Sequence, residues 1–120
     1  MIKLKTGTPN VIVNLYYGSN GPDTEHWATV NLLSRDTEGH TKSVRDIETV
    51  SIENLGVRAP SVIADMLEDA IKQTGASEIM GLGFIPGGFH SELENKVWDL
   101  LAEKGIIPLR GEDGESTRRK

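Results

Sequence analysis

The side chains best suited to chemistry lie in the polar stretch Asp23-Thr24-Glu25-His26. Two carboxylates and an imidazole supply the oxygen and nitrogen donors that divalent metal ions take from proteins. On an extended segment Asp23 and Glu25 share one side and His26 points to the other, so the three converge only where the chain curls. The stretch predicts either a metal site at Asp23, Glu25 and His26 or a solvated hairpin turn, and the spacing favours the turn.

A second candidate is the glycine-rich stretch at residues 81–91, which runs from an apolar segment into the start of a predicted helix. Backbone N–H groups at such a junction can bind anions. The glycine intervals match neither of the common phosphate-binding motifs, and no lysine follows the last glycine. We expect either a phosphate or small-anion site or a structural turn and helix cap, and the composition favours the turn. The residues of the candidate ligand site are Gly87, Gly88, His90 and Ser91.

A third candidate is an acidic stripe formed by Asp65, Glu68 and Asp69 on the outer face of a predicted helix. Glu68 and Lys72 are four residues apart, the spacing of a stabilising ion pair on a helix. The stripe predicts either an ordinary solvated helix face or a surface that docks a basic partner.

Nucleophilic catalysis has little support in the sequence. Ser19, Ser34 and Ser43 lack the Gly-x-Ser-x-Gly context, and His40 follows a turn without a neighbour that suggests chemistry. There is no cysteine, which excludes disulfides, thiolate metal sites and thiol nucleophiles. No particular cofactor is identified by any motif, and no Ser-His-Asp triad can be assembled.

Three extended segments precede the first helix. Residues 11–17 and 27–33 each carry apolar side chains at alternate positions along one face, and a turn rich in Gly, Asn and Pro separates them, which predicts a β-hairpin. A second turn at residues 36–39 leads into a third strand at 41–52, whose apolar residues fit no single period. A β-bulge near Ile47 would reconcile them.

A helix, a strand, a second helix and a short strand follow. Pro60 suits a first helical turn, and Gly75 suits the cap at the end of that helix. Residues 78–84 are apolar or Gly on both faces, which is typical of an interior strand parallel to an earlier one. A second helix runs from Ser91 to Gly105, and residues 106–109 predict a short edge strand.

The expected fold is therefore a single α/β domain over residues 1–109, with a mixed sheet and a polar, charged tail at 110–120. This order, the turn Gly18-Ser19-Asn20-Gly21-Pro22 and the following Trp27-Ala28-Thr29-Val30 resemble the ribonuclease H-like fold over about residues 11–104.

In that family, acidic residues on the first strand, the first helix and the end of the fourth strand hold two metal ions for phosphodiester hydrolysis. The resemblance places Asn14 at the first-strand position, and the fourth strand ends in Gly83-Phe84-Ile85-Pro86 without a carboxylate. Only the helix keeps acids, at Asp65, Glu68 and Asp69. We therefore expect the nuclease site to be absent.

Charge narrows the class of partner. The chain carries 18 acidic and 13 basic residues, a net charge of −5. An acidic body disfavours binding to nucleic-acid backbones.

No apolar run is long enough to span a bilayer, and the N-terminus lacks a signal-peptide pattern. We expect a cytoplasmic, non-catalytic regulatory or accessory module that binds another protein or itself through an acidic surface, a sheet edge or loop aromatics. The alternative is a phosphate-binding protein or metal-dependent hydrolase built on Gly87, Gly88 and His90.

Overall fold

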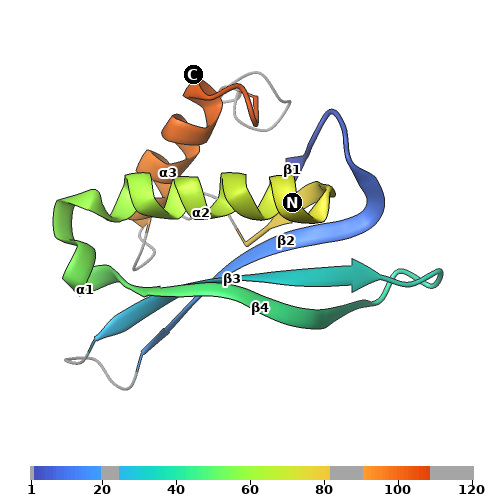
Figure 1. Cartoon of the computed structure of the whole chain (residues 1–120), viewed down its shortest axis with the longest axis horizontal. Helices are drawn as coiled ribbons and strands as arrows, with labels where there is room; N and C mark the ends of the chain where they lie inside the picture. The colour runs from blue at the N-terminus through green and yellow to red at the C-terminus, as the bar shows by residue number, and fades with distance from the viewer. Residues whose placement is uncertain (1, 20–24, 82–90, 109–120) are drawn as a thin grey trace.

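A computed structural model describes residues 2–19, 25–81 and 91–108 and shows a mixed α/β fold with a five-stranded sheet (Figure 1). The long helices α2 and α3 lie on one face of the sheet (Figure 1). The strand order is β1-β5-β2-β3-β4. The elements are β1 (Ile2–Lys3), β2 (Thr8–Ser19), β3 (His26–Arg35), β4 (Thr41–Ser51), α1 (Ile52–Leu55), the 3-10 turn η1 (Gly56–Arg58), α2 (Ala59–Thr74), β5 (Ala76–Met80) and α3 (Ser91–Glu103).

The predicted three-stranded meander is confirmed. β2 pairs antiparallel with β3, and β3 pairs antiparallel with β4. The register of the second pair shifts so that Ile47 is an extra residue between the partners of Val30 and Asn31, which is the predicted bulge. A second shift leaves Val44 as another extra residue, so the edge strand β4 is irregular at two places.

The predicted interior strand is also confirmed, because β5 pairs in parallel with β2 on one side and antiparallel with β1 on the other. Within the described residues the strand ends at Met80 and Gly81 is not part of it, whereas residues 82–84 of the predicted strand lie outside the described residues. Gly81 follows with a φ of +83°, and a Cβ there would lie 2.1 Å from the carbonyl oxygen of Leu15. Gly81 is therefore required by the close approach of the chain to β2.

The helix α2 has the predicted boundaries. Pro60 lies in its first turn, and Gly75 ends it in the left-handed conformation while its N–H donates to the carbonyl of Ile71. The predicted strand after α3 is wrong for the described residues 106–108, of which 106 and 107 form a bend and 108 has no regular structure. Ile107 is buried in the core there, so its apolar character serves packing against the helices and not sheet pairing.

The core lies between the sheet and the two long helices. Val13 and Leu15 of β2, Ile63 and Leu67 of α2, and Leu101 of α3 are almost completely buried in it. This core holds the first turns of α2 and of α3 in place relative to the sheet. A groove forms where these first turns lie beside α1.

Candidate functional site: a groove between α1, α2 and α3

The wall of the groove begins with a tight helical turn after β4. The Ser51 hydroxyl accepts a hydrogen bond from the N–H of Asn54 and caps α1. Gly56 then ends α1 with φ 56° and ψ −127°, and its N–H donates to the carbonyl of Ile52. Reversing the chain within so few residues leaves the next side chain, Val57, 98% exposed.

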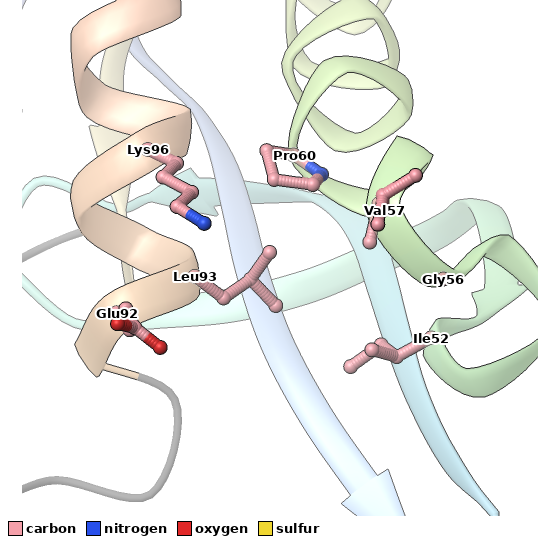
Figure 2. A pocket seen from close by; sticks show the side chains of 8 residues that line it. Ile52, Gly56, Val57, Pro60, Glu92, Leu93 and Lys96 are labelled. Carbon is pink, nitrogen blue, oxygen red and sulfur yellow. The ribbon is translucent and has the colours of Figure 1, made fainter.

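The groove itself has a volume of about 520 Å³ and is lined mainly by apolar side chains. Figure 2 shows Leu93 reaching from α3 toward Ile52 and Val57, with Pro60 at the start of α2 beside them. The size falls within the range of about 300–1,000 Å³ that is usual for ligand pockets. Among the described residues, the lining consists of Ile52, Gly56, Val57, Ala59, Pro60, Glu92, Leu93 and Lys96.

Two charged residues of α3, Glu92 and Lys96, border this apolar surface. They are four residues apart, a spacing at which an ion pair can form. The described part of the chain nevertheless contains no ion pair of either residue. Figure 2 shows the Lys96 amino group turned into the space between α3 and the start of α2. The groove therefore presents one positive and one negative group beside an apolar floor.

A clamp between β3 and α1 holds one wall of the groove in place. The backbone N–H of His26 donates to Glu53 Oε1 at 2.7 Å, and the His26 ring nitrogen Nδ1 lies 2.7 Å from Glu53 Oε2. Because a carboxylate only accepts, Nδ1 is the donor. These hydrogen bonds lower the pKa of Glu53 below its ordinary value. Glu53 is adjacent to Ile52, so the clamp positions a residue of the groove.

A buried carboxylate lies in the opposite wall. Glu94 of α3 is 8% exposed and lies near the phenol of Tyr17 on β2. Burial, together with the negative charge of Glu94, raises the pKa of Tyr17 above its ordinary value. The burial of Val97 and Trp98 in the core fixes the start of α3 against the rest of the fold, and Leu93 of the groove lies in the preceding turn.

The predicted metal residues are not brought together within the described chain. His26 is engaged by Glu53, Glu25 is exposed, and Asp23 lies outside the described residues. In the ranges 2–19, 25–81 and 91–108, no group of three or more His, Cys, Asp or Glu residues could hold a metal ion. Glu53, at 27 residues from His26, is the partner that local spacing could not indicate.

The predicted anion site falls largely outside the described residues. Gly87, Gly88 and His90 belong to the part that is not described. Ser91 is the first residue of α3, which agrees with the predicted start of the second helix.

The acidic stripe on α2 is partly neutralised by lysines. The predicted pair of Glu68 and Lys72 is confirmed at 3.4 Å. Lys104, which follows α3, lies 3.4 Å from Asp65 and 3.3 Å from Glu68, and Lys104 together with Lys72 lowers the pKa of Glu68. Asp69 is exposed on the same face. Much of the stripe therefore joins α2 to α3.

One cluster of polar side chains was not predicted from the sequence. The His40 ring nitrogen Nδ1 lies 3.7 Å from a carboxylate oxygen of Asp36 and 3.7 Å from one of Glu38, all in the exposed turn between β3 and β4. The alternation of Asp36, Glu38 and His40 was the available signal, since alternate residues can share a side. Asp36 also accepts the backbone N–H groups of Glu38 and His40, so the cluster shapes the turn.

Comparison with models of protein families, with curated protein sequences and with solved structures found no match. Within the described ranges, no helix combines the length and the apolar character needed to cross a membrane.

Proposed function

We propose that this protein is a non-catalytic protein-binding module whose contact surface is the groove patch. The groove patch comprises Ile52, Val57, Pro60 and Leu93 with the flanking charges of Glu92 and Lys96. An apolar hollow rimmed by polar groups is a common form of protein interaction site.

The observation that carries this proposal is the exposure of Val57 next to the groove. Val57 is 98% exposed, compared with 53% for Val44 and 42% for Tyr16. Burying a fully exposed valine in a partner contributes at most about 1.5–3 kcal/mol, so this residue has more apolar surface to gain from binding than the other two. Its position on the wall of a groove gives a partner both a projection and a hollow to fit.

The other predicted surfaces support binding less well. The outer edge of β4 carries two bulges as well as Lys42, Arg45, Asp46 and Glu48, and bulges and charges are the usual devices that prevent strand addition. The acidic stripe on α2 is occupied in part by contacts with Lys104. The groove patch lies away from the sheet edge, and its two charged residues, Glu92 and Lys96, form no ion pair within the described residues.

The ribonuclease H-like arrangement also remains a proposal, supported by the meander β2-β3-β4 and by the parallel pairing of β5 with β2. A nuclease function receives no such support. Asn14 donates its side-chain amide to Asn31 at 3.0 Å, and β5 ends at Met80. Asp65 and Glu68 contact Lys104 instead of facing Asn14.

A capture experiment with matched variants tests the proposed function. Tagged wild-type protein is incubated with its native extract at low and high salt, and bound proteins are identified and their stoichiometry measured. Val57→Asp should abolish stoichiometric capture, whereas Val44→Asp on the β4 edge should leave it unchanged. Equal capture by wild type and Val57→Asp would refute a role for the groove patch.

A further inference from the structure

We propose that the partner of the groove patch is a second copy of this chain, bound about a twofold axis. In the resulting dimer, Val57 of each copy inserts into the groove of the other. This inference rests on the proposed function, since it names the partner of the same surface. A twofold interface uses one patch on both subunits, so the patch must be complementary to itself in shape and in charge.

The shape of the groove patch meets this requirement. Val57 projects from the η1 turn with 98% of its surface exposed, and a hollow of about 520 Å³ lies beside it. A partner with only a projection or only a hollow would leave half of the patch unused. A second copy offers both, so each Val57 can be covered by Ile52, Pro60 and Leu93 of the other chain.

The charged residues of the groove patch are also complementary to themselves about a twofold axis. Lys96 and Glu92 lie on the same helix, and the described residues contain no ion pair of either one. Other lysines of this chain do form such pairs: Lys72 and Lys104 both contact Glu68. In a twofold dimer, Lys96 of one copy can meet Glu92 of the second copy, and the reverse pair forms by symmetry.

The walls of the patch are already held before any partner arrives. The His26–Glu53 clamp fixes α1, and the burial of Val97 and Trp98 in the core fixes the start of α3. Preorganisation of this kind lowers the cost of association, because few groups have to be ordered on binding. The proposed dimer therefore needs no rearrangement of α1 or α3.

Sedimentation velocity over a series from micromolar to millimolar protein tests this inference. The variants are Val57→Asp, Lys96→Glu, Glu92→Lys and the double variant Lys96→Glu/Glu92→Lys, with Val44→Asp as the control and circular dichroism to verify folding. Wild type and Val44→Asp should dimerise equally. Val57→Asp should weaken the dimer by about tenfold or more. Each single charge reversal should weaken it by about tenfold, and the double variant should restore it because both intermolecular pairs are re-formed.

A wild-type protein that stays monomeric throughout the series would overturn the inference, as would a double variant no better than either single one. The two proposals can fail separately. A monomer whose capture of a different protein depends on Val57 would overturn the second copy as partner and leave the proposed function standing. A monomer for which Val57→Asp changes no capture would overturn both.

Discussion

Replacing Gly81 with alanine should destabilise the protein far more than the same change at another glycine with positive φ. Gly81 has a φ of +83°, and an added Cβ would lie 2.1 Å from the carbonyl oxygen of Leu15 and 2.9 Å from the side-chain oxygen of Asn14. The Leu15 oxygen belongs to the backbone of β2, which is paired on both sides in the sheet. Relief of the clash therefore requires β2 or the chain after β5 to move.

The magnitude follows from two separate effects. A non-glycine residue in the left-handed region costs about 1–2 kcal/mol. Forcing extra atoms into a well-packed region costs about 1–3 kcal/mol more. Together they predict a loss of about 2–5 kcal/mol of unfolding free energy for Gly81→Ala. Gly39 has a φ of +90°, but a Cβ added there would meet no atom within 4 Å, so Gly39→Ala should show only the conformational cost of about 1–2 kcal/mol.

Urea unfolding of wild type, Gly81→Ala and Gly39→Ala, followed by circular dichroism, measures the difference. Equal slopes with a lower midpoint for Gly81→Ala would show that the native state itself has lost stability. If the two variants differ by less than about 0.5 kcal/mol, within the range of an ordinary surface substitution, the close approach of Gly81 to β2 is contradicted.

Three further predictions concern contacts that hold the fold. Leu67→Ala should cost about 2–5 kcal/mol in urea unfolding, because Leu67 is completely buried, and a loss below about 1 kcal/mol would contradict its place in the core. Arg35 donates two hydrogen bonds to Glu78 and lowers its pKa, so this stabilisation is complete above the ordinary glutamate pKa and disappears as the pH falls through the lowered value. The stability difference between wild type and Glu78→Gln should therefore shrink in acid, and a difference independent of pH would refute the pairing. Lys104→Ala should raise the pKa of Glu68 in an NMR titration, and an unchanged titration would rule out their contact.

Local patterns predicted the elements whose sequence signals are strong. The first helix was foreseen because Pro60 and Gly75 mark its ends and its buried residues recur with helical spacing. The bulge at Ile47 was foreseen because the alternation of apolar residues breaks there. The register shift at Val44 was not predicted, because a single bulge at Ile47 already accounted for the broken alternation of apolar residues in this strand.

Elements without a strong local pattern were missed or misplaced. β1 consists of only Ile2–Lys3 and exists because β5 offers it an unpaired edge, which no period of two residues can reveal. Residues 106–108 look like a strand by composition, yet Ile107 packs into the core after α3 instead. Tertiary packing decided both cases over local preference.

The groove could not be read from the sequence because its walls are far apart along the chain. Val57 and Leu93 line the same hollow although 36 positions separate them in the sequence. Val57 alone carried a weak signal, as an apolar residue between the third predicted strand and the first predicted helix. The His26–Glu53 clamp was hidden for the same reason, since its partners meet only through the pairing of β3 with β4.

The most direct test of the groove patch is a series of two-dimensional ¹H–¹⁵N NMR spectra of the wild-type protein at increasing concentration. Concentration-dependent shifts should be confined to the backbone amides of Ile52, Val57, Leu93 and Lys96, and they should vanish in Val57→Asp. Spectra that do not change with concentration, or shifts centred on the β4 edge or the acidic stripe of α2, would contradict self-association through this surface.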